Sequence, residues 1–132
     1  MWRGRVACSI RGKRGQALLR ELGDAMDAMP EKELITNELV EEGSYCALGV
    51  VGKARGLDIA AIDPEDSFTV AQRFNIAEPL AQEIAYLNDE GSWSETPSER
   101  WLRMRQWVRE NLKEADCRTH AKALIKASGG VL

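Results

Sequence analysis

The sequence contains a single histidine, three cysteines and no long hydrophobic run. Cys8, Cys46 and Cys117 are odd in number and far apart, which argues against a disulfide framework and is typical of a reducing compartment. No apolar stretch approaches the roughly 20 residues that cross a bilayer. No apolar signal-peptide core follows the basic start of the chain. We therefore expect a cytoplasmic protein with no membrane partner.

The shortage of histidine and cysteine also limits the metal chemistry. Cys117 and His120 form the only close pair of zinc ligands, whereas a structural zinc site needs four ligands. The acidic segment Asn88-Asp89-Glu90 could bind a hard cation as the carboxylates of a nuclease do. The favoured alternative is the solvated acidic end of a helix. We expect no metal, no cofactor and no enzymatic activity, and a metal-dependent nuclease is the alternative hypothesis.

The length of 132 residues predicts one domain, long enough to bury a hydrophobic core without disulfide bonds or a structural metal. The composition, 44% hydrophobic and 30% charged, is that of an ordinary globular protein. Within this single domain, residues 1–12 are a candidate basic arm and residues 115–132 a candidate flexible basic tail.

Apolar periodicity and capping signals predict most of the helices. A stripe that includes Leu18 and Leu22 predicts a helix over residues 15–29. Asp63 followed by Pro64 predicts the start of a second helix, which ends at a turn near Asn75. A third helix follows that turn. The segment 96–99 has the pattern of a capping box and predicts a helix through about residue 114, and a basic helix is expected over 117–127.

Residues 33–52 are the best candidates for strands. Two apolar runs flank the turn sequence 41–44, which favours a short β-hairpin. Residues 45–56, rich in small residues, fit a tightly packed short helix equally well. The fold class we expect is mainly α: a compact bundle of about four to five helices with a short hairpin near residues 33–52.

The charges are segregated along the chain. Residues 1–20 carry six bases and no acid, residues 21–99 carry eighteen acids against four bases, and residues 100–132 carry eight bases against three acids. Opposite charges could simply pair within the fold. The functional alternatives are a basic surface that faces phosphates and an acidic surface that faces a basic partner.

The two helices around Asn75 match the spacing of a helix-turn-helix motif, with Ala71, Ile76, Ala81 and Ile84 at the apolar positions. Any tight helical corner can produce this spacing, and a packing corner is the interpretation that we favour. The second helix is acidic, so phosphates would repel it from a DNA groove. Its acidic residues are instead candidates for binding a protein partner: Glu78, Glu83, Asp89 and Glu90.

The N-terminal bases are the better candidates for nucleic-acid binding, and they are Arg3, Arg5, Arg11, Lys13 and Arg14. Glycines at 4, 12 and 15 would let the backbone approach phosphates, and Trp2 could stack on a base. The alternative is a solvated basic segment that pairs with the acidic middle of the chain.

Several short segments carry a resemblance: residues 2–6, 10–16, 46–49 and 88–90, and Thr96-Pro97 with Arg100-Trp101. With these segments, residues 1–110 resemble small uncharacterised proteins of bacteriophages and prophages. The resemblance implies a setting in the bacterial host cytoplasm and no mechanism. We therefore expect a non-enzymatic accessory protein that binds a host or phage nucleic-acid-handling complex, such as a host defence system. Direct DNA or RNA binding by the basic N-terminal segment is the alternative, and the oligomeric state is open.

Overall fold

The computed structural model describes residues 2–113, and the side chains from residue 4 onward. This part of the chain contains six α-helices, one 3₁₀ turn and one hairpin: α1 (Trp2–Arg11), α2 (Lys13–Ala28), β1 (Val40–Glu41), β2 (Ser44–Tyr45), α3 (Ala47–Arg55), η1 (Ile59–Ala61), α4 (Ser67–Phe74), α5 (Glu78–Asp89) and α6 (Pro97–Asn111). The expected mainly α bundle with a short hairpin is confirmed. The helix expected over 117–127 and the tail from residue 115 lie outside the described residues.

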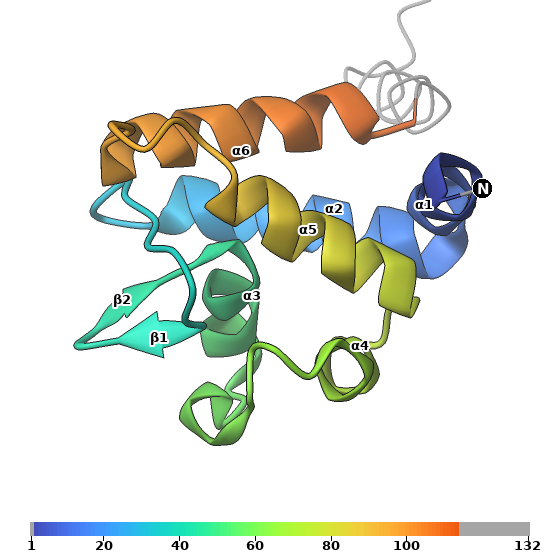
Figure 1. Ribbon diagram of the computed structural model, residues 1–132, viewed down its shortest axis with the longest axis horizontal. Helices are drawn as coiled ribbons and strands as arrows, with labels where there is room; N and C mark the ends of the chain where they lie inside the picture. The colour runs from blue at the N-terminus through green and yellow to red at the C-terminus, as the bar shows by residue number, and fades with distance from the viewer. Residues whose placement is uncertain (1, 114–132) are drawn as a thin grey trace, which may run out of the picture.

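Helix α5 occupies the centre of the fold. It contacts α1, α3, α4 and α6, and Figure 1 shows α6 above it and α3 with the hairpin below it. The apolar side of α5 includes Leu80, Ala81 and Ile84, which are all buried. Helix α2 packs against α3 and α6 and contributes Leu18, Leu19, Leu22 and Met26 to the same core. The predicted apolar stripe of residues 15–29 is therefore the buried face of α2.

Residues 2–11, a candidate arm from the sequence, form helix α1. Val6 is buried, and α1 packs on α5 and α2. Only Gly12 separates α1 from α2. A Cβ atom at Gly15 would lie 1.9 Å from the carbonyl oxygen of Ser9. The backbones of the two helices therefore touch at this corner, which only a glycine permits.

The segment that could be strand or short helix contains both. The hairpin consists of two residues in each strand, and its turn has Glu42 and Gly43 at φ values of 50° and 81°. Positive φ at both central positions is typical of a type I′ hairpin turn. Helix α3 starts two residues after β2, capped by the Sγ of Cys46, which accepts a hydrogen bond from Gly49 N. The apolar run from residue 47 is helical, and the helix is buried on nearly all sides. Its buried residues are Ala47, Leu48, Gly49, Val50, Val51 and Gly52.

The helix expected to start at Asp63-Pro64 starts later, at Ser67. The Asp63 carboxylate accepts a hydrogen bond from Glu65 N and so closes a turn. The true cap is Asp66, whose two carboxylate oxygens accept hydrogen bonds from Thr69 N and Thr69 Oγ1. Two capping signals lie three residues apart in the sequence, and the prediction used the first of them.

The corner between α4 and α5 is a packed one. Asn75 adopts the left-handed conformation that ends α4, and Ala71, Ile76, Ala81 and Ile84 are buried around it. Helix α6 begins at the predicted capping box, in which Thr96 Oγ1 accepts from Glu99 N and Glu99 Oε1 accepts from Thr96 N. No helix within residues 2–113 is long and apolar enough to span a membrane.

Gly15→Ala tests the close contact between α1 and α2. The new methyl group would overlap the Ser9 carbonyl, so the helices must separate, and we expect a loss of about 1–3 kcal/mol in the free energy of unfolding. Gly4→Ala is the matched control, because nothing lies within 4 Å of a Cβ at that position. It should be neutral or stabilise α1 by up to about 1 kcal/mol. Urea denaturation checks both variants, and equal effects would contradict the close packing.

Candidate functional site

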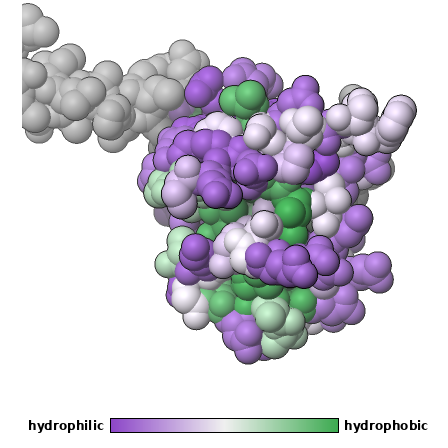
Figure 2. All heavy atoms as spheres, turned by 90° about the vertical axis from the view of Figure 1, so that its left-hand side faces the viewer, coloured by the Kyte–Doolittle hydropathy of each residue, from purple (hydrophilic) through white to green (hydrophobic). Residues whose placement is uncertain are grey.

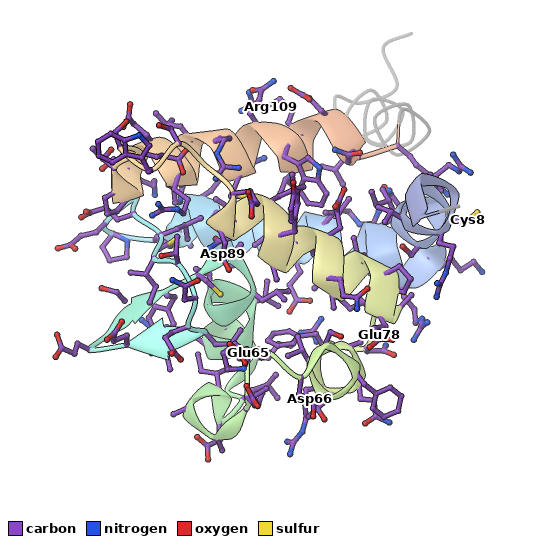
Figure 3. All side chains as sticks on the ribbon, viewed as in Figure 1. Cys8, Glu65, Asp66, Glu78, Asp89 and Arg109 are labelled. Atoms are coloured by element: carbon purple, nitrogen blue, oxygen red, sulfur yellow. The ribbon has the colours of Figure 1, made fainter. Side chains whose placement is uncertain are left out.

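A groove of about 830 Å³ opens along α5. Residues 37–39 and 46–48 form one wall, the segment 60–67 forms the other, and side chains of α5 lie between them. The groove thus joins the hairpin region, the start of α3, the loop before α4 and the central helix. In Figure 3, Asp89 marks its upper part and Glu65 its lower part. We call this feature the acid-edged groove.

The acid-edged groove has an apolar floor and an acidic margin. Its buried lining residues are mostly apolar: Leu39, Leu48, Ile62, Val70, Ala81 and Ile84. Four exposed carboxylates line it as well: Glu38, Asp63, Glu65 and Asp89. No arginine, lysine or histidine is among the described residues that line it. A groove of this kind attracts cations and repels anions.

The buried amide of Asn88 holds the walls of the groove in place. Asn88 is 1% exposed. Its Oδ1 accepts a hydrogen bond of 3.1 Å from Ala47 N, the first residue of α3, and its Nδ2 donates one of 2.8 Å to the carbonyl of Ile35. The neighbouring Asp89 carboxylate accepts a hydrogen bond from Asn37 N. The end of α5 therefore positions both α3 and the chain that leads into the hairpin.

The end of α5 is held in turn by Arg103 of α6. Arg103 donates hydrogen bonds to the carbonyl oxygens of Leu87 and Asn88, and its guanidinium forms an ion pair of 2.7 Å with Glu95. The hydrogen bond that Arg103 donates to the Glu95 carboxylate lowers the pKa of Glu95, whose side chain is 9% exposed. Arg100 also faces Glu95 and donates to the carbonyl of Leu34. Cations at the negative end of a helix stabilise it, so Arg103 caps α5.

Cys46 lines the groove but is held as a capping thiol. Burial raises its pKa to about 11, because the thiolate would lose its hydration. The side chain is therefore a neutral thiol near pH 7, and it accepts the hydrogen bond from Gly49 N at 3.4 Å. A thiol in this state is a poor nucleophile.

The structure separates the four acids that were predicted to bind a partner. Only Asp89 lines the groove. Glu78 lies at the start of α5, half-buried, and accepts a hydrogen bond from Ser67 Oγ. Glu83 is half-exposed and Glu90 is the exposed C-cap of the helix. The sequence prediction missed Glu38 and Glu65 as members of the same site, because only the folded chain brings them beside Asp89.

The predicted nucleic-acid contacts form a second feature. Arg11, Lys13 and Arg14 are exposed where α1 ends and α2 begins, and Arg5 is exposed earlier on α1; we call these four residues the basic corner. The side chain of Arg3 lies outside the described part of the structure. In Figure 1 the basic corner is at the right-hand end of the molecule, where α1 meets α2.

Most basic residues of α6, unlike those of the basic corner, form ion pairs within the fold. Arg100 and Arg103 form ion pairs with Glu95, and Arg105 pairs with Asp27 of α2 at 2.8 Å. Pairing within the fold thus accounts for three of the four arginines of α6, and the fourth, Arg109, donates to the neutral amide of Gln106. Such pairing does not account for the basic corner, because none of its four side chains forms an ion pair with a described residue.

No three histidine, cysteine, aspartate or glutamate side chains gather as a metal site within the described residues. Asp63 and Asp89 both line the groove, from the loop before α4 and from the end of α5, and Glu90 is not part of its lining. The pair Cys117 and His120 lies outside the described residues. Comparisons with family models, curated proteins and solved structures found no match for the chain.

Asn88→Ala should loosen the groove. The substitution removes three hydrogen bonds, with Ala47 N, the Ile35 carbonyl and the Asp89 carboxylate, and so takes the amide partner away from the buried Ala47 N–H and the Ile35 carbonyl. We expect a loss of about 2–4 kcal/mol in the free energy of unfolding, measured by urea denaturation. Glu90→Ala, at the exposed end of α5, should cost less than about 1 kcal/mol. Equal losses would show that the amide does not hold the walls.

Glu95→Gln should destabilise the fold in a pH-dependent way. The lowered pKa of Glu95 means that its ionised form contributes stability above the ordinary pKa of 4.5, and that this contribution is lost as the pH falls through the lower folded-state value. We expect a loss of about 1–2 kcal/mol at pH 7 that shrinks by pH 3. Unfolding in urea at both pH values checks this. Glu110→Gln on the exposed face of α6 is the control, and a loss for Glu95→Gln that is the same at both pH values would contradict the ion pair.

Proposed function

We propose that this chain is a non-enzymatic accessory protein that binds a nucleic-acid-handling protein complex through the acid-edged groove. The observation that carries the proposal is the combination of an apolar floor with four carboxylates at its margin and no base among its described lining residues. The occupant we propose is a single segment of the partner that carries arginine or lysine around one or two apolar side chains.

The dimensions and chemistry of the groove support such an occupant. A volume of about 830 Å³ is within the range of binding pockets, and apolar side chains gain free energy by leaving water for the floor. The margin acids would then face the basic side chains of the same segment. Charge complementarity of this kind mainly increases the association rate and the specificity. A phosphate-bearing ligand would be repelled from the same margin.

The charge of the groove also supports the class of partner. Proteins that handle nucleic acids present arginine and lysine to phosphates, and these are the side chains that an acidic margin attracts. An acidic groove can therefore occupy the surface that such a partner uses for its nucleic acid. The resemblance of residues 1–110 to phage and prophage proteins supports a host or phage complex, such as a host defence system, as the partner.

A second hollow, of about 600 Å³, lies between the end of α2, the hairpin and α3. Its lining includes Glu31 and Glu33 together with Lys53, whose ammonium group lies over the ring of Tyr45. Charges of both signs line this hollow, so it does not select a partner by charge. Figure 2 shows the face of the molecule on the hairpin side, which is largely hydrophilic with apolar residues visible between the polar ones.

The proposal is tested by affinity capture from a bacterial host lysate with and without nuclease. The groove variant combines Glu38→Gln, Glu65→Gln and Asp89→Asn. The control combines Glu41→Gln, Glu42→Gln and Glu110→Gln, which changes the net charge equally at exposed positions that do not line the groove. We expect the wild type and the control to retain a nucleic-acid-handling complex after nuclease treatment, and the groove variant to bind it at least about tenfold more weakly.

Two outcomes would contradict the proposal. If nuclease treatment releases everything that the wild type captures, the contact runs through nucleic acid and the groove is not the binding site. If the groove variant and its control lose the complex to the same degree, the net charge of the chain explains the binding, and the groove does not.

A further inference from the structure

We propose that the basic corner is a second binding site, which contacts the phosphate backbone of a nucleic acid. The site comprises Arg5 and Arg11 of α1 and Lys13 and Arg14 of α2. This inference stands on a different surface from the acid-edged groove and does not rest on the function proposed for that groove.

The first observation is that the bases of the corner have no acidic partner among the described residues. Arg11 Nη2 lies 3.9 Å from Cys8 Sγ, and Arg14 Nη1 lies 3.4 Å from Asn75 Oδ1. Both of these partners are neutral groups. Elsewhere in the fold Arg55 is bound to Glu21 at 2.6 Å, and Arg105 is bound to Asp27. Unpaired exposed cations at one place attract phosphates, because binding releases the counterions of the nucleic acid.

The second observation is the electrostatics at the start of α2. Gly12 is the N-cap and provides no side-chain hydrogen bond, and the first turn contains Lys13 and Arg14 but no acid. The N-terminus of a helix carries partial positive charge, so an acid is the favoured residue there. The carbonyls at the end of α1 lie against this helix start and offset part of that charge, so the two full positive charges of Lys13 and Arg14 are what favours an anion from outside the chain.

The third observation is that the corner is rigid and contacts the end of a third helix. The Ser9 carbonyl lies where a side chain at residue 15 would begin, so α1 and α2 are in backbone contact. The contact between Arg14 and Asn75 joins the corner to the end of α4, and Arg73 is exposed two residues before Asn75. The backbones of α1, α2 and the end of α4 are thus fixed relative to one another, which sets the positions on α1 and α2 from which the bases of the corner extend.

The shape of the corner indicates contact with the backbone and not with the bases of the nucleic acid. None of its four residues lines either the acid-edged groove or the second hollow. The exposed large apolar side chains of the described residues are Phe68, Tyr86, Trp93 and Leu102, and none of them belongs to the corner. Phosphate contacts without base contacts position a protein on nucleic acid but do not read its sequence. We therefore infer binding that is independent of sequence.

Fluorescence anisotropy with labelled 20-base-pair DNA duplexes of two unrelated sequences tests the site, at 50 mM and 200 mM NaCl. The corner variant combines Arg11→Gln with Lys13→Gln, and the matched control combines Lys53→Gln with Arg109→Gln, two exposed bases outside the corner. We expect the wild type to bind both duplexes with similar affinity. The corner variant should bind about 10- to 100-fold more weakly at 50 mM NaCl, with a salt slope smaller by about two, and the control should change less than about threefold.

Three results would overturn the proposal. The first is no binding of either duplex or of a 20-nucleotide single strand by the wild type at 50 mM NaCl. The second is an equal loss of affinity in the corner variant and its control. The third is binding to vesicles of phosphatidylcholine and phosphatidylglycerol without any binding to DNA, which would assign the corner to an anionic lipid surface. Circular dichroism of both variants checks that the fold is unchanged.

Discussion

The buried amide of Asn88 is the interaction on which the shape of the groove depends. The hairpin has only two residues in each strand, and a pair of strands this short is not stable alone. Its attachment to the helices comes in part from the amide, which binds the carbonyl of Ile35 on one side and the first N–H of α3 on the other. Arg103 of α6 then holds the end of the helix that carries Asn88. The end of α5 therefore determines the position of the groove wall that α3 and the hairpin region form.

The ion pairs distinguish three arginines of α6 from the bases of the corner and the acids of the groove margin. Arg100, Arg103 and Arg105 connect α6 to its neighbours, and each has a carboxylate partner within 3.4 Å. The bases of the corner and the acids of the groove margin have no such ion pairs. The corner bases come from residues 1–20, which contain no acid, and the groove acids come from the acidic segment 21–99. Residues that form ion pairs within the fold contribute to its stability. Those whose charges remain exposed and of one sign are the candidates for binding.

Local signals in the sequence predicted local structure well. The capping box at Thr96 and the turn around Gly43 depend on residues a few positions apart, and both are present in the structure. The start of α4 was wrong because Asp63 and Asp66 both carry a capping signal, and tertiary packing decides between them. The groove could not be predicted, because Glu38, Glu65 and Asp89 come from three separate segments. The role of Asn88 was not predicted either, because the segment 88–90 was interpreted as the solvated acidic end of a helix, whereas Asn88 is buried.

The position of α5 connects the two surfaces. One side of this helix packs against α1, whose exposed side carries part of the basic corner, and another side lies between the walls of the groove. In Figure 3, Cys8 on α1 points away from the molecule, while Asp89 and Glu65 lie near its middle. Surfaces of opposite charge favour different ligand groups: the groove attracts cations and repels anions, and the corner does the reverse. The protein segment that we propose for the groove and the phosphate backbone that we propose for the corner would therefore not compete for a surface, and the fold would hold both at a fixed separation.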